Sequence, residues 1–266
     1  MNDRAESPPQ TRTGRWFHHL APRPAARITL VCVPHAGAGT AAFGPWADLL
    51  PPEVEPVAVR LPGRESRRRD PLPSDWPTLA QEFALALERR ITGPYLLFGH
   101  SMGAMLVYES AVRGLARPPV RVLLSGCRAP TVPRALPAIH DLPTERFRSE
   151  LSRLAGTPGA VLASPRLMAL LEPVLRADIR LAETWSRPAD TADALPVPVT
   201  VFAGADDTVA PPAAVGAWRA LAPHGFRRRR VGGGHFFPYE RTSEFLGLLD
   251  DEIALCLGTS RRSHRP

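Results

Sequence analysis

Apolar positions along this chain follow two alternating patterns. Short runs that are apolar at nearly every position predict buried strands, and apolar residues repeated every three or four positions predict helices between them. Runs of the first kind span residues 28–33, 57–59, 95–98, 120–124 and 197–203, and a last strand is expected at 226–231. A short edge strand is expected at Trp16 and Phe17. Because helical faces separate most of these runs, the pattern favours an α/β fold with a mostly parallel central sheet flanked by helices.

The alternation stops between residues 130 and 188, where no strand-like run occurs. Such a stretch is much longer than the usual connection of about 2–6 residues, so we expect an inserted helical lid above the edge of the sheet. Its apolar side chains can either pack as a structural cap or line a substrate chamber. They are Leu162, Leu167, Met168, Leu170, Leu171, Val174, Leu175, Ile179 and Leu181. The expected core is residues 16–129 and 189–258, with a disordered leader at 1–15 and a disordered tail at 259–266.

Composition limits the classes of protein. The chain has 266 residues, 44% of them hydrophobic, which is enough for one domain with a sizeable core. The formal net charge is +7, and all 33 basic residues are arginines. Because the arginines are scattered, without interleaved aromatic residues, we expect no nucleic-acid partner. An acidic protein partner suits this charge equally well.

The cysteines and the lack of long apolar segments bear on the compartment. Cys32, Cys127 and Cys256 are odd in number, far apart and set among apolar residues, which is typical of reduced core cysteines. No charged-then-apolar signal segment opens the chain, and no apolar run approaches the roughly 18 residues of a membrane helix. We therefore expect a cytoplasmic protein with no membrane partner.

A serine lies at the sharpest break in the pattern. The apolar run 95–98 ends at Gly99-His100-Ser101-Met102-Gly103, and a helical repeat follows. Glycines on both sides of Ser101 match the nucleophile elbow, a turn so tight that only residues without a side chain let strand and helix pass each other. A match to G-x-S-x-G can arise by chance, but its strand, turn and helix context predicts an exposed nucleophile at Ser101.

An acid and a histidine follow this serine in the chain. Asp206 and Asp207 come just beyond the run 197–203, and His235 comes beyond the run 226–231. Each has a structural explanation on its own, a chain turn for the aspartates and a core position for the histidine. Their order after the serine, each past the end of a strand, matches the catalytic triad of the α/β-hydrolase fold. We expect Asp207 rather than Asp206 to orient His235, because Asp207 lies further past the strand end.

The residue types have complementary roles. A serine hydroxyl is a weak nucleophile until an imidazole accepts its proton, so His235 would be general base toward Ser101 and then general acid toward the leaving group. An oxyanion hole needs two N–H groups, which we expect from Met102 and from Ala36 in the glycine-rich loop 34–39. That loop has neither the ending nor the spacing of a nucleotide-binding loop.

Several stretches together resemble one family. They are Pro34-His35-Ala36-Gly37, Leu61-Pro62-Gly63-Arg64-Glu65, Gly99-His100-Ser101-Met102-Gly103-Ala104, Gly204-Ala205-Asp206-Asp207 and Gly233-Gly234-His235-Phe236-Phe237. With them the chain is similar to the stand-alone type II thioesterases that accompany polyketide and nonribosomal peptide synthetases. The resemblance implies an α/β-hydrolase fold with a helical lid, and hydrolysis of acyl groups from the phosphopantetheine arms of carrier proteins. It implies no cofactor and no metal, because the phosphopantetheine belongs to the acyl or peptidyl carrier protein; we expect a monomer.

Two other functions remain open. One is hydrolysis of free small esters or acyl-CoA by the same triad without carrier recognition, and the other is a non-catalytic binding module that keeps the fold. The complete triad argues against the binding module. For a carrier-bound substrate we expect basic residues around the mouth of the site. The candidates are Arg64, Arg128, Arg134 and Arg148.

Overall fold

A seven-stranded sheet forms the centre of the computed structural model, which describes residues 14–154, 156 and 159–258. The strands are β1 (Phe17–His19), β2 (Ile28–Val33), β3 (Val54–Val59), β4 (Tyr95–His100), β5 (Arg121–Ser125), β6 (Val199–Gly204) and β7 (Phe226–Val231). Their order across the sheet is β1-β3-β2-β4-β5-β6-β7. Every neighbouring pair is parallel except the antiparallel pair of β1 and β3. The predicted mostly parallel sheet is therefore confirmed.

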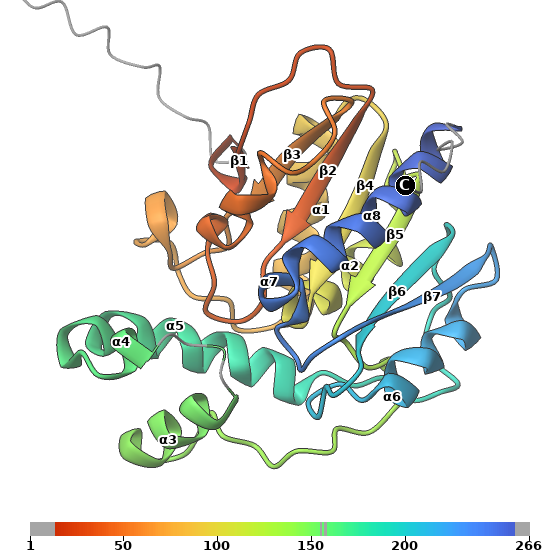
Figure 1. The fold of residues 1–266 in the computed structure, drawn as a ribbon. Helices are drawn as coiled ribbons and strands as arrows, with labels where there is room; N and C mark the ends of the chain where they lie inside the picture. Colours follow the sequence, from red (N-terminus) through yellow and green to blue (C-terminus); the bar gives the residue numbers. More distant parts are fainter. Residues whose placement is uncertain (1–13, 155, 157–158, 259–266) are drawn as a thin grey trace, which may run out of the picture.

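Helices cover both faces of this sheet (Figure 1). One layer contains α1 (Trp76–Arg90), α2 (Met102–Ala111), α6 (Pro212–Gly216) and the 3₁₀ helix η4 (Ala217–Leu221), and the other contains η2 (Thr40–Trp46), α7 (Phe237–Glu240) and α8 (Thr242–Leu257). Two further 3₁₀ turns are η1 (Gly14–Trp16) and η3 (Glu65–Arg67). Alternate residues of β4 enter the two layers: Leu97 packs in the core with α1 and α2, whereas Leu96 and Phe98 pack in the core with α8.

Polar caps start two of the long helices. The side chain of Asp75 accepts a hydrogen bond of 2.8 Å from the N–H of Thr78 and so closes the first turn of α1. Ser164 does the same for α5 (Pro165–Thr184), at 3.3 Å from the N–H of Leu167. A proline in the first turn of each helix costs no hydrogen bond, because the first N–H groups of a helix have no partner inside it.

The chain between β5 and β6 includes the segment 130–188, which we call the helical insertion, and the described part of this segment contains three helices. They are α3 (Thr144–Leu154), α4 (Gly159–Leu162) and α5. They share a small apolar core of their own, and α5 crosses beneath the sheet (Figure 1). At the end of α5, Leu181 and Trp185 pack into the main core, so the insertion is joined to the body by buried apolar contacts.

Some details differ from the sequence-based expectations. The strand expected at 57–59 begins earlier, at Val54. The sequence did not indicate this start, because Glu55 and Pro56 interrupt the apolar run. Leu170, expected among the lining or packing residues of the insertion, is 69% exposed. The expected leader and tail lie outside the described residues, apart from Gly14 and Arg15, which begin η1. Among the helices that the structure describes, none has the length and apolar character needed to cross a membrane.

Candidate active site

Ser101 occupies a strained turn between β4 and α2. Its backbone has φ 54° and ψ −119°, a region that costs a residue with a side chain about 1–3 kcal/mol. The flanking glycines make the turn possible, because a Cβ on Gly99 would lie 2.4 Å from the carbonyl oxygen of Gly103. A Cβ on Gly103 would lie 2.3 Å from the carbonyl oxygen of Val33. The local sequence thus places the Ser101 hydroxyl beyond the carboxyl end of the sheet.

The three residues expected to form a triad are in contact. Nε2 of His235 lies 2.9 Å from Oγ of Ser101, and Nδ1 of His235 lies 2.9 Å from Oδ2 of Asp207. The other carboxylate oxygen of Asp207 accepts hydrogen bonds from the N–H groups of Val209, at 2.9 Å, and Ala210, at 2.8 Å. Asp207 is buried and fixed on both oxygens. The neighbouring Asp206 is exposed, so the turn presents Asp207 and not Asp206 to the imidazole.

The two N–H groups expected to form an oxyanion hole are free. Ala36 lies in the loop after β2, and Met102 is the first residue of α2. Within the described part of the chain, neither N–H donates to a hydrogen-bond acceptor. Ala36 and Ser101 line the same cavity. The arrangement can therefore offer donors to an oxygen that develops negative charge next to Ser101.

Two histidines beside the site stay uncharged, and no role had been predicted for either. Burial lowers the pKa of His35 to about 4 and lowers the pKa of His100 far below its ordinary range. The ring centroid of His100 is 5.2 Å from that of His235, and Nδ1 of His35 donates to the carbonyl oxygen of Ala36 at 3.0 Å. Because both rings are neutral, they add no positive charge near His235. Their positions next to Ala36 and Ser101 in the sequence were the available signal.

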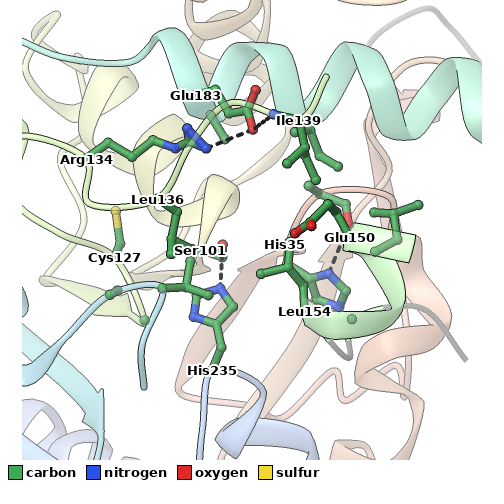
Figure 2. A pocket seen from close by; sticks show the side chains of 18 of the residues that line it. His35, Ser101, Cys127, Arg134, Leu136, Ile139, Glu150, Leu154, Glu183 and His235 are labelled. Carbon is green, nitrogen blue, oxygen red and sulfur yellow. Dashed lines mark hydrogen bonds and ion pairs between the residues drawn. The ribbon is translucent and has the colours of Figure 1, made fainter. Parts of the chain in front are cut away.

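A cavity of about 150 Å³ leads away from Ser101 and His235. Figure 2 shows these two residues on one side of it, with Arg134 and Glu183 across the opening and Glu150 and Leu154 from α3 on the other side. The helical insertion supplies most of the remaining lining. Its apolar contributions include Leu136, Pro137, Ile139, Leu151, Leu175, Ile179 and Ala182. An apolar wall facing a polar reactive group is suited to an acyl chain.

A second cavity, of about 510 Å³, lies next to the first. It is bounded by the loop 35–39, by residues of η2 and α5, and by Tyr239. His35, Ala36, Leu175 and Phe236 line both cavities. Gly156 is shared as well, so the two cavities adjoin along these residues, and of the two Ser101 lines only the smaller.

The arginines expected around the mouth are mostly engaged elsewhere. Arg64 is buried, and its guanidinium binds Asp178 and the carbonyl oxygen of Ala38, so the expectation is wrong for this residue. Arg128 lines the smaller cavity, but its terminal nitrogens bind backbone carbonyls. Arg134 also lines that cavity and pairs with Glu183 at 2.9 Å. Arg148 pairs with glutamates of the insertion and lines neither cavity.

The described residues offer neither a metal site nor a reactive thiol beside Ser101. The described residues contain no cluster of three or more histidine, cysteine, aspartate or glutamate side chains that could hold a metal ion. All three cysteines are free thiols, and Cys32 and Cys127 are buried. Burial raises the pKa of Cys127 to about 12, so this thiol is protonated although it lines the cavity. Ser101, by contrast, lies at this cavity in contact with an imidazole nitrogen that can accept its proton.

Comparison with known proteins identifies the family. A family model described as Thioesterase domain matches residues 28–253. The gramicidin S biosynthesis protein GrsT of Aneurinibacillus migulanus is 32% identical over 250 residues, which cover 93% of this chain and 97% of that protein. The structure of BorB, a type II thioesterase from the borrelidin biosynthetic cluster, is 33% identical with a TM-score of 0.78, covering 90% of this chain and 98% of that one. YbtT, a type II thioesterase from the yersiniabactin NRPS/PKS pathway, is 29% identical with a TM-score of 0.81, covering 91% and 99%.

These matches extend over nearly the whole described chain. The family model begins at β2 and ends inside α8, so it includes every strand of the sheet except β1, the helical insertion and the loops that carry Ser101, Asp207 and His235. The similar structures share the same overall fold at TM-scores near 0.8. This chain therefore belongs to the thioesterase family, beside the type II thioesterases of polyketide and nonribosomal peptide biosynthesis, and is a thioester hydrolase.

Proposed function

We propose that Ser101 is the nucleophile of this thioesterase, with His235 as general base and acid and Asp207 as the residue that orients the imidazole. The observation that carries this assignment is the pair of 2.9 Å contacts that join the three side chains. Asp207 accepts from Nδ1–H and so leaves the lone pair of Nε2 directed at the serine hydroxyl. This tautomer is the one that can remove the serine proton.

The chemistry proceeds in two halves. Oγ of Ser101 attacks the thioester carbonyl carbon while its proton passes to Nε2 of His235, and the N–H groups of Ala36 and Met102 stabilise the oxyanion. The carbon–sulfur bond then breaks, and the thiolate takes the proton from His235, which leaves an acyl-serine. Water attacks this ester with His235 again as base, and collapse of the second tetrahedral intermediate releases the acid and restores Ser101. These steps use no cofactor or metal.

The proposed substrates are acyl groups carried on the phosphopantetheine arms of acyl or peptidyl carrier proteins. The similar proteins are named for the gramicidin S, borrelidin and yersiniabactin pathways, which supports a role beside a synthetase. We infer that the enzyme removes aberrant or stalled acyl units from such carriers. We also propose that the enzyme acts as a monomer, because Ser101, His235 and Asp207 of a single chain lie within hydrogen-bond distance of one another.

Two thioesters of one acyl group test this proposal. The rate of hydrolysis is measured on the acylated carrier protein and on the same acyl group attached to free pantetheine. A kcat/KM at least about tenfold higher on the carrier, which corresponds to about 1.4 kcal/mol of recognition, is the expected result. Equal kcat/KM values would favour a hydrolase of free thioesters or acyl-CoA without carrier recognition. If folded protein with the wild-type sequence hydrolysed neither thioester, the result would favour a binding module.

A further inference from the structure

The loop 35–39, which carries the N–H of Ala36, has few side chains of its own. Its sequence is His-Ala-Gly-Ala-Gly, and Gly37 has φ +77°, a conformation that residues with a side chain rarely adopt. Small residues leave a loop with many accessible conformations in isolation. Contacts from the rest of the molecule must therefore fix the direction of the Ala36 N–H.

An acidic residue of the helical insertion supplies one of these contacts. Asp178 lies on α5 and is fully buried. Its Oδ2 accepts a hydrogen bond of 2.8 Å from the N–H of Gly37. This bond joins two segments that are 141 positions apart in the sequence. The peptide group directly after Ala36 is thus held from outside the loop.

Arg64 completes the arrangement from a third segment. Its Nη2 donates to both carboxylate oxygens of Asp178, at 2.9 Å each, and its Nη1 donates to the carbonyl oxygen of Ala38 at 2.9 Å. Burial raises the pKa of Asp178, and the Arg64 guanidinium and the Gly37 N–H oppose this shift. The Arg64 guanidinium thus favours the charged form of the carboxyl group that holds the loop.

The peptide groups on both sides of Ala36 are restrained. Between Ala36 and Gly37, the carbonyl accepts from His35 and the N–H donates to Asp178. Between His35 and Ala36, the carbonyl of His35 accepts from the N–H of Ala38 at 3.1 Å. Leu175, one turn before Asp178 on α5, fills the space beside Gly37, where a Cβ would lie 2.2 Å from its Cδ2. Only the N–H of Ala36 in these two peptide groups is left to donate to a substrate, within the described residues.

We propose that Asp178, paired with Arg64, is a positioning residue that holds the Ala36 N–H in the direction required by the oxyanion. The inference rests on the proposed roles of Ser101 and Ala36. Neither Asp178 nor Arg64 lines the two cavities described above, so the pair acts through the loop and not on the substrate. A buried ion pair by itself adds little to stability compared with apolar residues of the same shape. A role in positioning gives this pair a function that apolar replacements lack.

Two double variants separate positioning from stability. Arg64→Met combined with Asp178→Leu removes both charges and leaves the Gly37 N–H without an acceptor. Arg64→Met combined with Asp178→Asn also removes both charges, but the amide oxygen of asparagine can still accept from Gly37. The two proteins differ only at position 178, where leucine and asparagine have a similar size and shape. Neither protein contains an unpaired buried charge from the pair. Comparing them therefore tests the hydrogen bond to Gly37.

Each variant is assayed for kcat and KM on an acyl N-acetylcysteamine thioester, for binding of an alkylboronic acid, and for Tm. The boronate forms a tetrahedral adduct with a serine and places an oxygen in the oxyanion hole. We expect kcat and boronate affinity of the leucine variant to fall by about 10- to 100-fold. This is a smaller effect than removal of an oxyanion-hole donor, which lowers kcat by about 10²–10³. The KM of the leucine variant should change by less than about threefold, since ground-state binding is retained. The asparagine variant should recover most of the loss in kcat.

A buried carboxylate elsewhere in the molecule is the control. Glu252 on α8 is fully buried and binds Thr200, Arg227 and Arg229, and it lines neither cavity. Glu252→Gln should lower Tm and leave kcat and boronate affinity unchanged. Equal kcat values in the two double variants, or losses that follow Tm in all three proteins, would overturn the inference about Asp178. If Ser101→Ala instead kept both its activity and its boronate affinity, the proposed nucleophile would be wrong and the inference would fail with it.

Discussion

Nε2 of His235 lies 2.9 Å from Oγ of Ser101, although 134 positions separate the two residues in the sequence. The contact forms because β4 and β7 belong to the parallel part of one sheet, so the loops after them open at the same edge. Gly126, just after β5, leaves room between these loops. A Cβ there would lie 2.6 Å from Cε1 of His100 and 3.4 Å from Cε1 of His235. Proximity of the two reactive groups is therefore a property of the whole sheet.

Ser101→Ala should abolish thioester hydrolysis while the chain keeps its fold. The change removes the attacking oxygen but leaves the flanking glycines, which make the turn possible, in place. Hydrolysis of an acyl thioester and the circular dichroism spectrum measure the two effects. Ser110→Ala is the matched control, because Ser110 is a buried serine on α2, the helix that follows Ser101, and it lines neither cavity. Activity above a few per cent in purified Ser101→Ala would mean that another group attacks.

Asp207→Asn should lower kcat by roughly 10⁴, by allowing the wrong imidazole tautomer. Asp206→Asn, at the adjacent exposed position, should leave kcat within about twofold, as expected for an exposed surface substitution. Steady-state kinetics of the two variants on one substrate give the comparison. A larger loss in Asp206→Asn would reverse the assignment of the orienting carboxylate.

The free energy of unfolding should decrease as the pH is lowered from about 6.5 to about 4. Burial lowers the pKa of His35 in the folded chain to about 4, whereas the unfolded residue titrates near 6.5. Between these values the unfolded chain binds the extra proton, so acid stabilises the unfolded state. The contribution of neutral His35 is complete above about 6.5 and is lost as the pH falls toward 4. Urea denaturation at several pH values measures this slope.

Substitution of His35 tests how much this residue contributes to the pH dependence of the free energy of unfolding. His35→Asn keeps an N–H donor for the carbonyl of Ala36 but removes the titrating ring, so its stability should depend less steeply on pH. His18→Asn, at an exposed position of β1, serves as the control for loss of a histidine. Identical slopes for the wild type and His35→Asn would show that His35 does not contribute.

Ile179→Ala should shift the preference of the enzyme toward longer acyl chains. Ile179 lines the cavity next to Ser101, and its truncation adds space that further methylene groups can fill. Each newly buried methylene is worth about 0.8 kcal/mol, or roughly fourfold in kcat/KM. The ratio of kcat/KM values across a series of acyl thioesters measures the shift. Leu170→Ala, on the same helix but 69% exposed, should leave the ratio unchanged; an unchanged ratio in Ile179→Ala would place the acyl chain elsewhere.

Local sequence patterns were sufficient to predict several strands, the turn at Ser101 and the edge of the sheet where the site lies. The run 28–33 has the bounds of β2, because burial of a strand on both faces shows directly as a nearly continuous apolar segment. The strand expected at 226–231 also has the bounds of β7, although four of its six residues are arginines. Glycine spacing around Ser101 predicted the elbow, since the close approach of two backbones excludes side chains at fixed positions. The order of serine, aspartate and histidine then indicated that their loops meet at one edge of the sheet.

Only the tertiary structure decided how the polar groups pair. Arg64 and Asp178 are 114 positions apart, and nothing local in the sequence indicates that they pair. In the same way, the sequence favoured Asp207 over Asp206 from its place in the turn, but the contact with His235 depends on where a loop after another strand runs. Local periodicity reports which side chains avoid water. Which partner a buried charge or an N–H group finds depends on segments that meet only when the chain is folded.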